Sequence, residues 1–242
     1  MKRCVKNLVF VFDLDKTIGY FTQVAIFLEG VEDYIGRKLK KNEMYKIFDL
    51  YPEIFRPDMI AIFKYLKELK QKKKCIKIMI YTNNIGPKSW VNDIKKYIEK
   101  KIKYKLFDRT IAAWKVDGKV YEKCRTSYEK KYTDLLKCGK LKKIDKIIFL
   151  DDMKHPSMKH PNVTYLHLKG YKHDILFKKM SKVHIHLTAA SSSSTTAKKT
   201  TYVLLTASQL VLSAVISRSV QSANFRLIQS ECTCARWALP HC

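Results

Sequence analysis

Short apolar runs that end in polar side chains alternate along this chain with segments of helical periodicity. The runs read as buried strands and cover 8–12, 75–82, 146–152 and 163–168. Amphipathic helices are predicted between them, over 57–71, 87–102 and 129–138. This alternation is typical of a doubly wound α/β domain with a parallel sheet. We therefore predict an α/β fold of three layers, Rossmann-like, with a central, mainly parallel sheet.

The first run leads directly into two carboxylates, Asp13 and Asp15, in "LVFVFDLDKT". Burying an acid is costly unless it is paired, and neighbouring acids raise each other's pKa. A cation would relieve the conflict, and carboxylate oxygens are ligands that Mg²⁺ prefers. An alternative needs no metal, since Asp15 could cap a helix while Asp13 sits in a turn. This stretch alone favours neither.

Two further runs also end in reactive groups. The second is followed by Thr82 and Asn83, and the third by Asp151 and Asp152. Open parallel sheets bind ligands at the carboxyl ends of their strands. We therefore expect these side chains to converge with Asp13 in one crevice.

In this order the motifs resemble the haloacid dehalogenase superfamily, through Asp13-Leu14-Asp15-Lys16-Thr17, Thr82, a Lys before the last strand, and Asp151-Asp152. More narrowly, the chain is similar to the phosphatases that act on the C-terminal domain of RNA polymerase II, including their NLI-interacting-factor relatives. The stretches that carry this similarity are "FRPDMIAIFKYL" (55–66), "LFDRTI" (106–111) and "TDLLKCG" (133–139). The resemblance covers residues 5–180, approximately.

The resemblance implies a Mg²⁺-dependent phosphoserine/phosphothreonine phosphatase that works through an aspartyl-phosphate. Asp13 would be the nucleophile, and Asp15 would protonate the leaving group. The metal would be held by Asp13, the main-chain carbonyl of Asp15, and Asp152, with Asp151 orienting a metal-bound water and the catalytic Lys. Thr82 would bind a phosphoryl oxygen.

The catalytic Lys is harder to place. Aligning "TDLLKCG" on the family's "KDL" puts Thr133 where the Lys is expected. Lys130 and Lys131 lie about one helical turn before Asp134. We favour Lys130 as the catalytic, phosphate-binding group, with Asn83 adjoining the phosphate. A Lys pair in a Lys-rich chain is also typical of a solvated face.

Other polar residues near these motifs can be explained without a functional role. The loop 125–127, "RTS", could contact a phosphopeptide or be an ordinary polar loop. His155 and His160 have no ligand-spaced partner, so we read them as surface residues. About 38 residues separate the first motif from Arg56. This length predicts a small insert and no large cap domain, which leaves the crevice open to a macromolecular substrate.

The charge balance favours acidic partners. Lys plus Arg is 48 and Asp plus Glu is 22, so the formal charge is +26. Forty of the basic residues are Lys and eight are Arg. Nucleic-acid readers often use bidentate Arg, and an AT-rich genome would also give a Lys excess. A phosphorylated protein such as the polymerase C-terminal domain is the expected partner. The alternatives are a nucleic-acid-end or nucleotide phosphatase and a non-catalytic phosphopeptide-binding module.

Composition changes near residue 188. We predict a phosphatase domain over 1–187, a Ser/Thr-rich linker over 188–200, and an extension of unknown structure over 201–242. The apolar stretch 202–216 is short for a membrane span. Seven Cys occur without CxxC or zinc spacing, and no signal peptide precedes the first strand. We expect free thiols and an intracellular, cytoplasmic or nuclear, location.

Overall fold

The computed structural model describes residues 8–74, 77–143, 145–175, 180, 185–187 and 201–203. The chain divides into two compact units, of which the first comprises Met1–Thr22 and Tyr45–His173. The second comprises Gln23–Met44 and Asp174–Cys242. Every candidate site residue named above belongs to the first unit.

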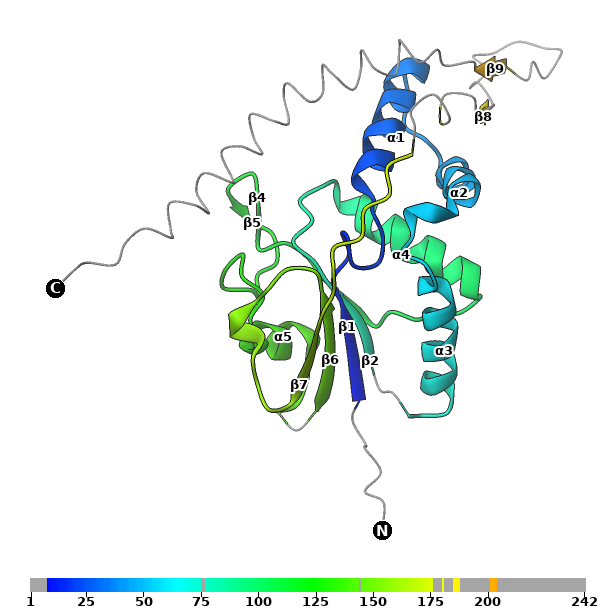
Figure 1. Ribbon diagram of the computed structural model, residues 1–242. Coiled ribbons are helices and arrows are strands. Elements are labelled where there is room, and N and C mark those ends of the chain that lie inside the picture. The colour runs from blue at the N-terminus through cyan, green and yellow to red at the C-terminus, as the bar shows by residue number, and fades with distance from the viewer. Residues whose placement is uncertain are drawn as a thin grey trace. The chain divides into compact units, whose positions relative to one another are not determined.

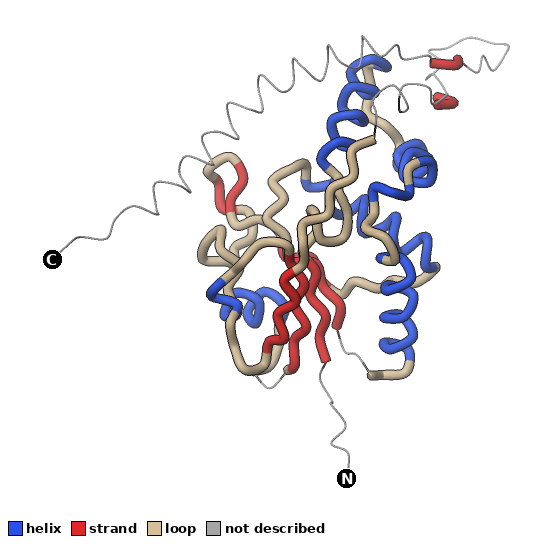
Figure 2. Tube along the Cα trace, in the orientation of Figure 1, coloured by secondary structure: helices blue, strands red, loops and turns tan. Residues whose placement is uncertain are grey.

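A five-stranded sheet forms the centre of the first unit, and all of its strand pairs are parallel (Figures 1 and 2). In spatial order its strands are β3 (Arg109–Ile111), β2 (Lys77–Tyr81), β1 (Leu8–Phe12), β6 (Lys146–Asp151) and β7 (Val163–His167). The register sets Phe12 beside Ile80 of β2 and Leu150 of β6. The chain therefore leaves these three strands at the same edge of the sheet. The predicted α/β class with a parallel sheet is confirmed.

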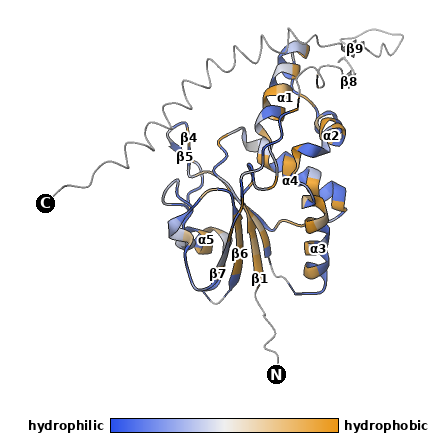
Figure 3. Ribbon diagram, in the orientation of Figure 1, coloured by the Kyte–Doolittle hydropathy of each residue, from blue (hydrophilic) through white to orange (hydrophobic). Residues whose placement is uncertain are grey.

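Helices cover both faces of this sheet, because side chains of a strand alternate between its faces. On one face Val11 packs into a buried cluster that includes Leu135 of α5 (Tyr132–Gly139). On the other, the Phe12 ring meets Phe63 of α3 (Met59–Gln71) edge to face. Helix α4 (Lys88–Ile102) packs beside α3. Figure 3 shows the apolar residues gathered on the strands and the helix faces turned toward them. The three-layer arrangement is thus also confirmed.

A small hairpin is inserted after β3. It pairs β4 (Lys115–Val116) with β5 (Lys119–Val120) in antiparallel fashion. Its turn residues, Asp117 and Gly118, have φ of 49° and 74°. Positive φ at both positions marks the turn that matches the twist of two short strands. No large cap domain is seen in the described part of the chain.

Two predicted helices start later than expected. Helix α3 begins at Met59, because Asp58 takes a left-handed conformation with φ of 62°. Helix α5 begins at Tyr132 rather than at residue 129. Lys130 and Lys131 therefore precede the helix, and the reason lies in the loop contacts described below.

The segment between β1 and α3 holds two helices that the sequence did not predict. They are α1 (Thr22–Ile35) and α2 (Lys41–Leu50), followed by the 3-10 turn η1 (Pro52–Ile54). In the second unit, the side chain of Gln23 exchanges two hydrogen bonds with the backbone of Ile175, of 2.5 and 2.7 Å. Such reciprocal bonds satisfy both the amide donor and the amide acceptor.

The second unit also contains an antiparallel pair of short strands, β8 (Ile185–Leu187) and β9 (Thr201–Val203). The predicted linker 188–200 lies outside the described residues. So does 204–242, which includes most of the apolar stretch 202–216. Among the described residues, no helix combines the length and the apolar character that a membrane span requires.

Candidate active site

Three strand ends bring their polar residues together, as predicted. Asp13, Thr82 and Asp151 follow or end β1, β2 and β6, and each is buried. The Asp13 amide donates to Leu150 O at 2.9 Å, and the Thr82 amide donates to Ile111 O at 3.0 Å. These bonds extend the ladder by one residue, so the side chains sit at the rim of the sheet.

Lys130 joins two of these acids. Its Nζ lies 2.5 Å from Asp13 Oδ1 and 2.7 Å from Asp151 Oδ2, and the side chain is 1% exposed. Lys131 points elsewhere, with its Nζ 3.4 Å from Thr126 Oγ1. The structure therefore places Lys130, and not Lys131, within the acid cluster. A buried ammonium needs such partners, because an unpaired charge is expensive away from water.

Arg125 shapes the loop that delivers Lys130. It is 3% exposed, and its guanidinium donates to the carbonyls of Thr82, Ala112 and Tyr128 at 3.1, 2.8 and 2.9 Å. One side chain thus ties the loop to the end of β2 and to the segment after β3. Arg125 therefore acts as a structural anchor of this loop, and its phosphopeptide contact stays a prediction.

A disulfide closes the same loop. Cys124 and Cys138 are bonded across a separation of 14 residues, so the expectation of free thiols is wrong for this pair. Asp134 of α5 adds a polar tie, accepting from the Thr126 amide at 2.9 Å. A helix begun at residue 129 would break these contacts and carry Lys130 away from Asp13.

The second acid of the first motif has an amide partner. Asn84 Nδ2 donates to Asp15 Oδ2 at 2.8 Å, and the Asn84 amide donates to Thr82 Oγ1 at 3.0 Å. Asn83, which the sequence singled out, is exposed and makes no hydrogen bond within the described part of the chain. Two adjacent Asn residues look alike in sequence, and only the turn after Thr82 decides which one faces inward.

The turn after Asp15 is held from outside. Lys16 has a φ of 61°, which a residue with a Cβ rarely adopts. Its carbonyl accepts from Arg56 Nη2 at 2.6 Å and from the Tyr171 amide at 2.8 Å. The same Arg56 nitrogen also donates to Lys169 O at 2.9 Å. Arg56 therefore fixes the backbone that carries Asp15.

Asp13 and Asp151 share the Lys130 ammonium, yet their pKa values move in opposite directions. Burial raises the pKa of Asp13 to about 7, although the Lys130 charge opposes this. Burial also pushes the pKa of Asp151 upward, but His155 and Lys130 outweigh it and the pKa is lowered. The second partner explains the difference, since His155 Nε2 lies 3.4 Å from Asp151 Oδ2.

The other two acids hold protons more tightly than free carboxyls. Burial raises the pKa of Asp15, and the Asn84 hydrogen bond only partly offsets this. Burial, followed by the charge of Asp151, raises the pKa of Asp152. A carboxyl with a raised pKa can act as a proton donor near neutral pH.

The acid cluster offers the oxygen ligands that a hard cation prefers. One carboxylate oxygen from each of Asp13, Asp151 and Asp152 lies within 4.8 Å of the others. Oxygen-only ligands with excess negative charge fit Mg²⁺. Gly170 leaves room at this point, because a Cβ there would lie 3.0 Å from Asp152 Oδ2. The residues present therefore fit the predicted metal, with Asp151 in the cluster beside the two predicted carboxylate ligands.

The two histidines past the last motif are partly exposed, and each makes a specific contact. His155 contacts Asp151, and the His160 ring stacks on Tyr132 with 3.8 Å between centroids. Spacing rules for metal ligands could not reveal either role, since neither contact involves a metal. A His four residues after an acid at a strand end is the one available signal.

Comparisons with known proteins identify no relative. No protein-family model matches the chain, and searches of curated proteins and of solved structures return no similar protein.

Proposed function

We propose that this protein is a Mg²⁺-dependent phosphoserine/phosphothreonine phosphatase with Asp13 as its nucleophile. The supporting observation is the contact of the buried Lys130 ammonium with both Asp13 and Asp151 at 2.5 and 2.7 Å. An acid two residues after Asp13, held by Asn84, completes the arrangement. The resemblance of the ordered motifs to phosphatases of the polymerase C-terminal domain points to the same chemistry.

The proposed first step transfers the phosphoryl group to the protein. An Asp13 carboxylate oxygen attacks phosphorus, and the bond between phosphorus and the ester oxygen breaks. Asp15 gives its proton to the leaving alkoxide, so the products are an aspartyl-phosphate and a free hydroxyl. The raised pKa of Asp15 supports this role, because the carboxyl must be protonated when the substrate arrives.

The second step regenerates the carboxylate. A water attacks phosphorus, Asp15 takes one of its protons, and the bond between phosphorus and Asp13 breaks to release inorganic phosphate. Lys130 stays beside the reacting oxygen throughout, where its charge stabilises the transition state. The Thr82 hydroxyl accepts from the Asn84 amide, which leaves its own proton free for a phosphoryl oxygen.

A cation belongs to this scheme because carboxylates repel a phosphate dianion. Asp13 and Asp152, with the Asp15 carbonyl, would hold Mg²⁺, and Asp151 would stay with Lys130. When bound, the ion supplies positive charge that offsets the repulsion between nucleophile and substrate.

A phosphoprotein such as the polymerase C-terminal domain is the proposed substrate, in the nucleus or cytoplasm. The formal charge of +26 favours a second class of substrate, the phosphorylated ends of nucleic acids or nucleotides. The chemistry at Asp13 would be the same for both.

Hydrolysis of para-nitrophenyl phosphate by the full chain tests the proposal. We expect turnover with Mg²⁺, none with chelator, and a loss of about a thousandfold or more in Asp13→Asn. Asp117→Asn, in the exposed hairpin turn, is the matched control and should retain full activity. A folded, Mg²⁺-loaded protein that binds phosphopeptide without turnover would instead be a binding module.

A further inference from the structure

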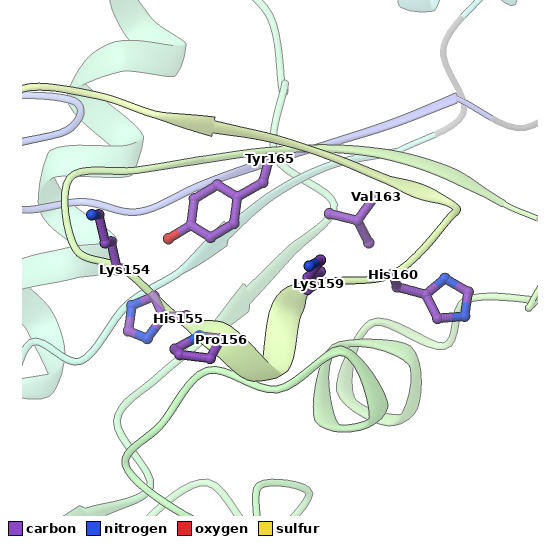
Figure 4. Close-up of a pocket in the computed structure, with 7 residues that line it drawn as sticks. All are labelled: Lys154, His155, Pro156, Lys159, His160, Val163 and Tyr165. Atoms are coloured by element: carbon purple, nitrogen blue, oxygen red, sulfur yellow. The ribbon is translucent and has the colours of Figure 1, made fainter.

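A cavity of about 310 Å³ opens beside β7 (Figure 4). Its lining residues come from β7 and from the connection that precedes it. They are Lys154, His155, Pro156, Lys159, His160, Val163 and Tyr165. None of them has a part in the proposed phosphoryl transfer.

The cavity exists because the connection between β6 and β7 is short. Only residues 152–162 link these parallel strands, whereas a crossover usually needs a dozen or more and contains a helix. Here the connection forms a single 3-10 turn, η2 (Pro156–Met158). One turn cannot cover the face of an edge strand, so Val163 and Tyr165 stay half-buried and line the gap.

A chain of contacts links the cavity to the proposed nucleophile. His155 lines it, and the Nε2 of this residue is 3.4 Å from Asp151 Oδ2. The same Asp151 oxygen binds Lys130, which contacts Asp13. Two buried side chains, Asp151 and Lys130, thus connect the cavity wall at His155 to Asp13.

Several polar atoms inside the cavity wall already have partners. The Tyr165 hydroxyl donates to Met153 O, and His160 Nδ1 accepts from the Asn162 amide at 3.1 Å. His155 faces the acid cluster. A nucleobase placed here would lose hydrogen bonds at its edges, which is costly. An apolar side chain loses none, so the wall favours a peptide.

Two lysines give the cavity a positive rim. Lys154 and Lys159 are exposed, and within the described part of the chain neither side chain makes a hydrogen bond or ion pair. Long Lys stems can line an apolar space while their ammonium groups stay in water. Asp151 is buried, and Glu129 accepts from the Ser157 amide at 3.1 Å. The rim therefore suits acidic groups on a partner.

We propose that this cavity is a substrate subsite for an aromatic or branched apolar side chain, flanked by acidic residues, near the phosphorylated residue of a peptide. Its volume is at the lower end of the range for ligand pockets, enough for one large side chain. This inference rests on the proposed phosphatase function and adds sequence preference to it.

The test compares three substrates in the full chain. They are para-nitrophenyl phosphate, a phosphopeptide with Phe and Glu beside the phosphoserine, and the same peptide with Ala and Lys instead. The test variant is Lys154→Glu/Lys159→Glu. Its matched control is Lys64→Glu/Lys96→Glu, which makes the same charge change at exposed positions of α3 and α4.

We expect the wild type to prefer the Phe/Glu peptide. The KM of the test variant for the Phe/Glu peptide should rise about tenfold with kcat nearly unchanged, because the rim charges act on binding. Turnover of para-nitrophenyl phosphate should not change, and the control should behave as wild type. Val163→Phe, which fills the cavity, should lower kcat/KM for the Phe/Glu peptide toward that for the Ala/Lys peptide.

Equal kcat/KM for the two peptides in the wild type, or an equal loss in the control, would overturn the subsite. Absence of para-nitrophenyl phosphate turnover would instead contradict the phosphatase. In that case fluorescence anisotropy with the same peptides and variants still tests the subsite. The wild type should bind the Phe/Glu peptide more tightly than the Ala/Lys peptide, and the test variant should lose this preference.

Discussion

Replacing Lys130 by Met probes the acid cluster most sharply. The ammonium is 1% exposed, and its two carboxylate partners lie at 2.5 and 2.7 Å. Met keeps the length and apolar stem of the side chain and removes only the charge. Breaking a buried ion pair from one side costs about 3–5 kcal/mol, because the remaining charge is left uncompensated. Here two carboxylates, Asp13 and Asp151, lose their shared partner.

The cost should depend on pH in a defined direction. Burial already raises the pKa of Asp13 to about 7 with Lys130 present, and loss of the Lys raises it further. A folded-state pKa above the unfolded value means that stability is retained at low pH and falls as pH rises through the folded pKa. In the wild type the pKa of Asp151 is lowered, so its ionised form stabilises the fold at pH values above the unfolded pKa. This contribution is smaller without Lys130. The variant should therefore lose less stability at pH 5, where only the Asp151 contribution is missing, than at pH 8, where it should be about 3–5 kcal/mol less stable than the wild type.

Urea unfolding followed by circular dichroism, with chelator present, measures this difference at both pH values. Lys131→Met is the matched control, since its Nζ lies 3.4 Å from the Thr126 hydroxyl and does not join the acid cluster. The reasoning is refuted if the two variants lie within about 1 kcal/mol of each other at pH 8. A Lys130→Met deficit that is larger at pH 5 than at pH 8 would refute the sign of the argument.

Three further predictions concern the supports of the site. Arg56→Ala should slow hydrolysis of an alkyl phosphate more than that of para-nitrophenyl phosphate. The loosened turn misplaces Asp15, and only the alkoxide, the poorer leaving group, needs the Asp15 proton. An equal loss for both substrates would indicate a general structural role. Cys138→Ser should lower the free energy of unfolding by about 3 kcal/mol, the value for a loop of this length, and dithiothreitol should do the same to the wild type in thermal melts. Asp152→Asn should raise the Mg²⁺ concentration for half-maximal activity by about tenfold or more, whereas an unchanged Mg²⁺ requirement would remove this residue from the metal site.

The sheet could be predicted from the sequence because its signals are local. Runs such as 8–12 and 146–152 are too apolar to be surface strands, and their alternation with amphipathic helices leaves few arrangements. The rim position of Asp13, Thr82 and Asp151 then follows from parallel strands ending at one edge. These expectations needed no knowledge of tertiary contacts.

The remaining parts of the site depend on contacts distant in sequence. Lys130 reaches Asp13 only because Arg125 and the disulfide bend the loop before α5, and no local pattern encodes that bend. Arg56 contacts the backbone at Lys16, across 40 residues. The sequence could not choose between Asn83 and Asn84 for a similar reason, since a turn of unknown shape decides which side chain faces inward.

Trapping the covalent intermediate tests the central claim most directly. The full chain with Mg²⁺ is mixed with a phosphopeptide substrate, quenched, and treated with borohydride, which reduces an acyl phosphate to the alcohol. Peptide mass spectrometry then locates the reduced residue. The account predicts homoserine at position 13, dependent on substrate and on Mg²⁺, with no reduction at Asp15, Asp151 or Asp152. Turnover of the substrate without modification at Asp13 would contradict it.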